Sequence, residues 1–115
     1  MTIRVLDIIG KKIGISTEDG QKLNRAIIQH IQDGESVEVS FEGIDIVISH
    51  FLNEGIGKLY KTFPKTEWNK LNHRLTYTGL SGGDEELLVK KVIPISQSHF
   101  ENENANTTIQ DQILE

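Results

Sequence analysis

The chain has 115 residues, 37% of them hydrophobic and 25% charged, and it contains no cysteine. This length and composition predict one globular domain with a single modest core. The absence of cysteine excludes disulfides, thiolate metal sites and cysteine nucleophiles. No apolar run approaches the roughly 20 residues that cross a bilayer, and the first residues lack the pattern of a signal peptide, so we expect a cytoplasmic protein with no membrane partner.

The net charge of −5 comes mostly from the C-terminal end. From Glu101 onward there are four acidic residues and no basic ones, so residues 1–100 hold 13 acids against 12 bases. Such a nearly neutral body offers no basic surface to a phosphate backbone, and nucleic-acid binding is not expected. The four histidines are scattered without the spacing of metal ligands, so we expect neither a metal nor another cofactor.

The first half of the chain predicts strands around one long helix. Gly10 ends a β-branched run, Ser16 and the acids after it are typical of a helix N-terminus, and apolar residues then recur every four positions until Gly34. Beyond Gly34 the apolar residues alternate, as they do in a strand. In chain order we expect a strand over 3–9, a turn or short strand over 11–15, a helix over 16–34, a strand over 35–41 and an extended segment over 44–48.

The second half continues with helices and one more strand. In chain order we expect a helix from Ser49 or His50 to Pro64, a strand within 71–80, and a helix from 82 that Pro94 kinks or ends. The whole order predicts an α/β fold, with a mixed four- to five-stranded sheet and about three helices packed on it. We assign residues 1–97 to this domain and residues 98–115 to a polar acidic tail, either loose or docked as a short helix.

Two short stretches of the chain superficially resemble catalytic or phosphate-binding motifs. The run 55–58, Gly-Ile-Gly-Lys, lacks the earlier glycine and the following hydroxyl of a phosphate-binding loop, so we expect its glycines either to let a helix approach the sheet closely or to leave that helix weakly formed. Ser49 and His50 are adjacent at a helix start and point in different directions, which makes a nucleophile and base pair unfavourable. A serine there is better explained as the N-cap of the helix, or as a phosphorylation switch whose added charge would alter a binding surface.

The stretch around Ser49 resembles a known family. The runs 39–44, Val-Ser-Phe-Glu-Gly-Ile, 48–54, Ile-Ser-His-Phe-Leu-Asn-Glu, and 57–60, Gly-Lys-Leu-Tyr, resemble STAS-like domains of unknown function, which are similar to anti-sigma factor antagonists. The resemblance covers most of residues 1–97 and is strongest over 35–63. In the antagonists, a kinase of the histidine-kinase-like ATPase fold phosphorylates the serine of an Asp-Ser pair. Ser49 matches that serine, while Ile48 replaces the aspartate and His50-Phe51 replaces a small Ser-Gly pair.

The resemblance implies a non-catalytic regulatory domain that docks a protein partner through the Ser49 corner and the helix that follows. The implied partner is a histidine-kinase-like ATPase, and Ser49 is the phosphorylation candidate. The alternatives are a phosphorylation switch in a partner-switching system, a small-ligand-binding domain, or a homodimer formed through an exposed sheet edge; a small hydrolase is the least favoured. The expected partner-binding residues are Ser49, His50, Phe51, Asn53, Glu54 and Lys58.

Overall fold

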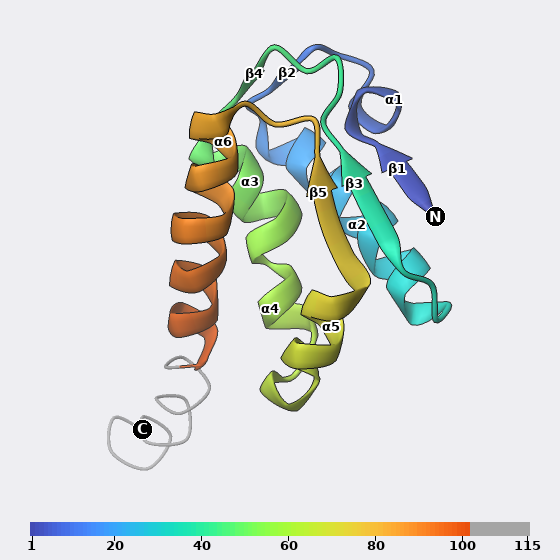
Figure 1. Cartoon of the computed structure of the whole chain (residues 1–115), viewed down its shortest axis with the longest axis vertical. Coiled ribbons are helices and arrows are strands. Elements are labelled where there is room, and N and C mark those ends of the chain that lie inside the picture. The colour runs from blue at the N-terminus through green and yellow to red at the C-terminus, as the bar shows by residue number, and fades with distance from the viewer. Residues whose placement is uncertain (102–115) are drawn as a thin grey trace.

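A computed structural model describes residues 1–101 of the chain and shows an α/β fold (Figure 1). The main sheet has three parallel strands in the order β1 (Thr2–Arg4), β3 (Val37–Ser40) and β5 (Leu75–Thr78). A separate parallel ribbon pairs β2 (Ile13–Gly14) with β4 (Ile46–Val47). The α/β class is therefore confirmed, but the expected mixed sheet of four to five strands is wrong. Helices connect the strands, and such crossovers make neighbouring strands parallel.

The helices are more numerous than the three we expected. Within residues 1–101 they form five continuous bodies, two of which contain a π-helical segment. The five are α1 (Val5–Ile9); α2 (Thr17–Gln32); a helix made of α3 (Ser49–Leu52), η1 (Asn53–Gly57) and α4 (Leu59–Thr62); the 3-10 turn η2 (Lys65–Glu67) with α5 (Trp68–Arg74); and a last helix running from α6 (Gly82–Glu86) through η3 (Leu87–Val92) to residue 101.

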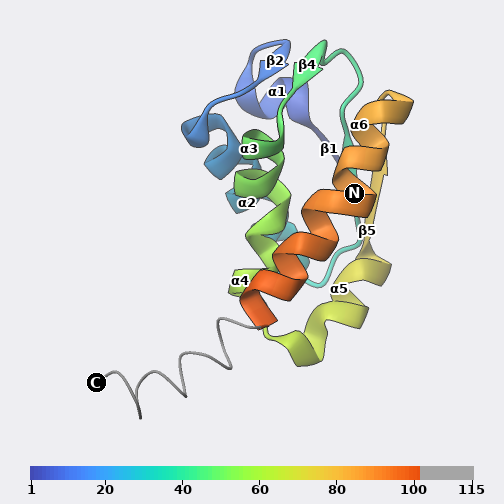
Figure 2. The same cartoon turned by 90° about the vertical axis from the view of Figure 1, so that its left-hand side faces the viewer.

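The main sheet is covered on one face only. Figures 1 and 2 show α2 and the helix 49–62 on the same side of the sheet. Val37 and Val39 of the central strand point to that side and are fully buried. The opposite face is polar, and there Thr78 donates a hydrogen bond of 2.8 Å to Glu38 across the strands. The core therefore lies between the sheet and the two helices.

The expected strand over 3–9 is wrong beyond Arg4, where the chain turns into α1. Val5 and Ile9 are one helical turn apart, and both are buried. Gly10 adopts a left-handed conformation with φ of 70°, and its N–H donates to the carbonyl of Leu6. Such a glycine is a common helix end. Burial of one helical face and this cap therefore outweigh the strand preference of the β-branched residues.

The last helix continues beyond the point where we expected it to end. Pro94 lies inside it, and helical structure extends to residue 101. The π-helical segment η3 ends at Val92, two residues before the proline. Val92 and Ser96, on either side of Pro94, are buried, so packing against the body of the domain holds the helix across it. Residues 98–101 of the expected tail thus belong to this helix, and the remainder of the tail lies outside the described residues.

Candidate functional site

Ser49 is exposed at the point where the chain leaves β4 and enters α3. The N-cap of this helix is Ile48, with extended backbone angles and no side-chain cap, and Ser49 is the first helical residue. The expectation that Ser49 is the N-cap is therefore wrong by one position. Among the described residues the Ser49 hydroxyl has no hydrogen-bond partner, which leaves it open to solvent.

His50 contacts a different hydroxyl from the one beside it in sequence. Its Nε2 lies 2.6 Å from Oγ1 of Thr17, the first residue of α2. Both side chains are exposed. The contact ties the N-terminal ends of α2 and α3 together, 33 residues apart in sequence. Within residues 1–101 no hydrogen bond orients the other ring nitrogen of His50, as the third member of a catalytic triad would.

Two of the six expected partner-binding residues are buried. Phe51 is fully buried, and its ring lies over the backbone of Gly14 in β2. Glu54 is only 7% exposed, and its carboxylate lies 2.9 Å from Nζ of Lys58 on the next turn. Phe51 and Glu54 would therefore affect a partner indirectly, by placing the helix. Asn53 is exposed and Lys58 is half-buried, and both are accessible together with Ser49 and His50.

The helix that carries these residues packs very closely on α2. A Cβ added to Gly20 of α2 would lie 2.6 Å from Cβ of Glu54, and one added to Gly55 would lie 2.9 Å from a methyl group of Leu23. Asn24 of α2 donates a hydrogen bond of 3.2 Å to the carbonyl of Gly55, within the π-helical segment. The expected close approach thus exists, but it is to α2 and not to the sheet.

The N-terminal end of α2 is anchored by a buried carboxylate. Asp19 is 2% exposed, and its carboxylate lies 2.8 Å from Nζ of Lys11 and 3.7 Å from Nζ of Lys22. The hydrogen bond from Lys11 is the main reason that the pKa of Asp19 is lowered, and it outweighs the opposite effect of burial. Ser16 caps the helix by accepting a hydrogen bond from the Asp19 backbone N–H. These contacts fix the position of Thr17, which holds His50.

Asn53 and Lys58 also line a hollow of about 260 Å³ between their helix and the last helix. Gly57 allows the close approach there, because a Cβ at this position would collide with the Ser96 hydroxyl. The complete lining is Asn53, Gly57, Lys58, Ile95, Ser96, His99 and Phe100. Two expected partner-binding residues therefore face a concave surface, while Ser49 and His50 lie outside it.

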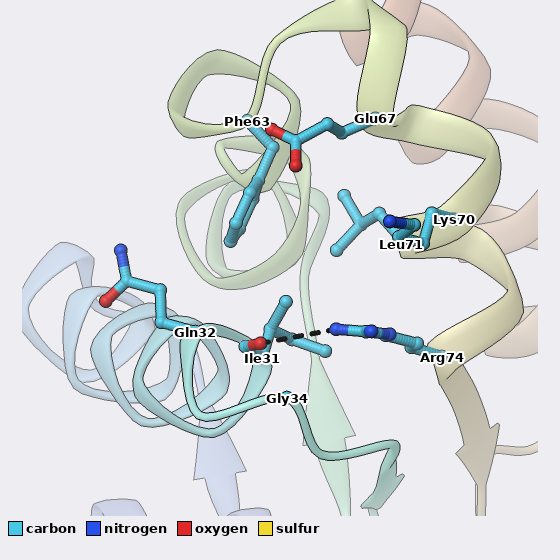
Figure 3. Close-up of a pocket in the computed structure, with 8 residues that line it drawn as sticks. All are labelled: Ile31, Gln32, Gly34, Phe63, Glu67, Lys70, Leu71 and Arg74. Atoms are coloured by element: carbon cyan, nitrogen blue, oxygen red, sulfur yellow. Dashed lines mark hydrogen bonds between the residues drawn. The ribbon is translucent and has the colours of Figure 1, made fainter.

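A second hollow, of about 280 Å³, lies near the C-terminal end of α2 (Figure 3). Glu67, Lys70 and Arg74 of the η2 and α5 segment face Ile31 and Gln32 of α2 across it. The Arg74 guanidinium donates a hydrogen bond of 3.5 Å to the carbonyl of Ile31, so it caps the end of α2. None of the residues expected to form the site lies here, and the pattern of the sequence offered no signal for this hollow.

The isoleucines of β2 and β4, which lead into α2 and α3, were also missed as surface residues. Ile46 and Ile48 belong to an alternating apolar run that is typical of residues facing a core. In the structure both are exposed, and Val47 between them is the buried residue. The two-residue period of this run was visible in the sequence. The alternation does not show which of the two faces of the extended segment points to the core.

A comparison with protein families identifies the family of the chain. A family model described as a STAS-like domain of unknown function (DUF4325) matches residues 19–85. This is more than half of the chain, so the chain belongs to this family of STAS-like domains. No curated protein and no solved structure matches it. Of the helices within residues 1–101, none is long and apolar enough to span a membrane, and the same residues contain no group of three side chains placed to hold a metal ion.

Proposed function

We propose that this STAS-like domain is a non-catalytic regulatory domain, which docks a protein partner through the Ser49 corner and the helix that follows. One observation carries the proposal: Ser49, His50 and Asn53 are exposed on a helix whose apolar side, with Phe51 and Leu52 at its start, is buried in the core. A rigid helix start with accessible polar groups suits recognition of a partner, since little conformational entropy is lost when the partner binds.

The geometry of the hydroxyls favours binding over catalysis. His50 is within hydrogen-bond distance of Thr17, not of Ser49. Neither of the two hollows described above includes Ser49, His50 or Thr17. A nucleophile and base that act on a bound substrate need a shared pocket and an orienting third group, so we favour a domain that binds and does not catalyse.

The partner that we propose is a histidine-kinase-like ATPase, as in the related anti-sigma factor antagonists. The test is calorimetric titration of the full chain with purified ATPases of this class from the same organism. His50→Glu and Asn53→Arg, both at exposed positions, should each weaken the complex at least tenfold. Asn53→Arg should leave the melting temperature unchanged, and His50→Glu should lower it only slightly, because the contact with Thr17 that it loses is exposed. Lys70→Glu is the control, because Lys70 lines the distant hollow of Figure 3. Equal affinity for all of these chains would remove the proposed corner as the docking site.

A second candidate function, a phosphorylation switch at Ser49, rests on the unpaired hydroxyl. A phosphate there would stand at the first residue of a helix, where the dipole favours negative charge, and would place nearly two charges on the docking corner. Ser49→Asp should then weaken the complex, whereas Ser49→Ala should not. Incubation with the ATPase and ATP, followed by intact mass measurement, gives the direct readout; a chain that gains no phosphate would eliminate the switch but not the docking.

A further inference from the structure

The hollow of about 260 Å³ between the helix 49–62 and the last helix contains a polar group that the fold leaves unpaired. Ser96 of the last helix lines this hollow and is only 7% exposed. Within residues 1–101, its hydroxyl has no hydrogen-bond partner. Buried polar side chains are nearly always paired with the protein or with a bound molecule. The Ser96 hydroxyl is therefore available to a molecule that enters the hollow.

Asn53 reaches the same part of the hollow from the facing helix. A Cβ added to Gly57 would collide with the Ser96 hydroxyl and would lie 3.5 Å from Oδ1 of Asn53, so both polar groups lie next to Gly57. Any side chain at position 57 would fill the space that these two groups share. Asn53 and Gly57 are the first and last residues of the π-helical segment η1, and π-helical turns are frequent at functional sites.

The described lining of this hollow contains basic side chains and no acidic one. Its lysine, Lys58, is held by Glu54 on the preceding turn, whose two carboxylate oxygens lie 3.1 and 2.9 Å from Nζ. Glu54 is buried and is not part of the lining. The ammonium group retains a further N–H donor beyond those that Glu54 accepts. Lys58 therefore provides a fixed donor at the hollow, with its charge balanced from behind.

The last helix supplies an apolar side to the same hollow. Ile95 is 65% exposed, and the ring of Phe100 lies edge-on to that of His99 with their centroids 4.9 Å apart. At about 30 Å³ for each water-sized group, the hollow has room for roughly nine non-hydrogen atoms. It thus suits a small molecule that has one polar end and one apolar end.

We propose that this hollow binds a small organic acid. Its carboxylate accepts hydrogen bonds from the Ser96 hydroxyl, the Asn53 amide and the Lys58 ammonium group, and its apolar part lies against Ile95 and Phe100. A carboxylate suits this set because it only accepts hydrogen bonds and can take several donors at once. The inference does not rest on the proposed docking function, and it assigns a ligand to surface that lies outside the Ser49 corner.

The hollow of Figure 3 is a poorer candidate for such a ligand. Its glutamate, Glu67, would repel a carboxylate, and its arginine, Arg74, already donates to the carbonyl of Ile31. Its other polar side chains, those of Gln32 and Lys70, are exposed. It has no counterpart of the buried and unpaired Ser96 hydroxyl.

Benzoate is the probe that tests the proposal, because it has the required size, a carboxylate and an apolar ring. Benzamide, which has the same shape without the charge, is the matched compound. Each is titrated into the isotope-labelled full chain and followed by NMR, so that the probe competes with any segment of the chain for the hollow. Benzoate should shift the amide signals of residues 53–58 and 95–100 and bind at least fivefold more tightly than benzamide. Equal affinity for the two compounds, or the absence of shifts in these segments at millimolar benzoate, would overturn the proposal.

Substitutions of serine show whether the Ser96 hydroxyl binds the carboxylate. Ser96→Ala should weaken benzoate binding at least fivefold without lowering the melting temperature, because the lost hydroxyl has no partner in the protein. Ser49→Ala, which also removes an unpaired hydroxyl but lies outside the hollow, is the matched control and should bind benzoate like the original chain. Lys58 is left unchanged, since its removal would leave the buried carboxylate of Glu54 unpaired.

The same Ser96→Ala chain separates this inference from the proposed function. It should bind the ATPase with the affinity of the original chain, because Ser96 lies outside the docking corner. A Ser96→Ala chain that binds benzoate as tightly as the original chain would refute the ligand site, whatever its affinity for the ATPase. Loss of benzoate binding in a chain that still binds the ATPase would support the ligand site as a second, separate site.

Discussion

Gly20→Ala should destabilise the domain by forcing α2 away from the helix that carries Ser49. The added Cβ would lie 2.6 Å from Cβ of Glu54 and 3.1 Å from the carbonyl oxygen of Phe51. Carbon atoms in contact prefer about 3.5–4.0 Å, so the two helices would have to separate by roughly 1 Å. Neither contact atom is the flexible end of a side chain, and the strain cannot be relieved by a rotamer change alone.

The expected change in the free energy of unfolding of the Gly20→Ala chain is the difference between two opposing effects. Overpacking of this kind costs about 1–3 kcal/mol, while alanine in place of glycine inside a helix contributes up to about 1 kcal/mol of stability. We therefore expect a net loss of about 1–2 kcal/mol in the free energy of unfolding. For a domain of this size that corresponds to a melting temperature lower by roughly 4–12 °C.

Urea unfolding followed by far-ultraviolet circular dichroism measures the effect. Gly83→Ala is the matched control: it lies in α6, and a Cβ there would meet no atom within 4 Å. It should be neutral or slightly stabilising, because it gains helix propensity without a collision. A Gly20→Ala chain that unfolds at the same urea concentration as the Gly83→Ala chain would refute the close helix crossing. The hydrogen bond from Asn24 to the Gly55 carbonyl should be lost together with the stability.

Two further predictions concern the anchor of α2 and the division between buried and exposed residues of the site. Asp19→Asn should destabilise the domain by about 1–2 kcal/mol at pH 7, because a charged hydrogen bond is lost. The lowered pKa of Asp19 means that its contribution is fully present above the ordinary carboxyl pKa of 3.8 and disappears as the pH falls through the lower folded value. The free energies of unfolding of the original and the Asp19→Asn chains, measured in urea, should therefore converge below about pH 4. A constant difference between them down to pH 2 would contradict a charged Asp19 as the source of this stability. Phe51→Ala should lower the free energy of unfolding by about 3–5 kcal/mol, whereas Ser49→Ala should leave it within about 0.5 kcal/mol in the same measurement; comparable losses would mean that Ser49 has a structural partner.

The features that follow from local chemistry were predictable from the sequence. The helix over 16–34 was found because a capping serine, first-turn acids and a four-residue apolar repeat act within one segment, and α2 has the expected Ser16 cap. The strand over 35–41 was found from its two-residue apolar alternation, and the helix that starts near Ser49 from its apolar stripe, which are also local patterns. The family resemblance was strongest in this region, and the family match includes it.

The features that depend on packing between distant segments were not predictable. Whether Ile46 or Val47 points inward is decided by Phe51 and Gly14, which lie on other elements, and the alternation alone is the same in either case. Val5 to Ile9 became a helix because α2 offers a surface for its buried side, against the local strand preference. His50 likewise met Thr17, a residue far from it in sequence.

The central position of β3 has a consequence for the order in which the chain can fold during synthesis. Thr2 pairs with Glu38, 36 residues later, and β5 in turn pairs only with β3. While β3 and β4 are still inside the ribosome, β1 and β2 have no strand to join, although α2 carries its own cap. Parallel pairs between distant segments form late and leave apolar surface exposed until then. Residues 1–36 therefore wait for β3, and a ribosome-associated chaperone would meet their core residues unprotected: Ile3, Val5, Ile9, Leu23, Ile27 and Ile31.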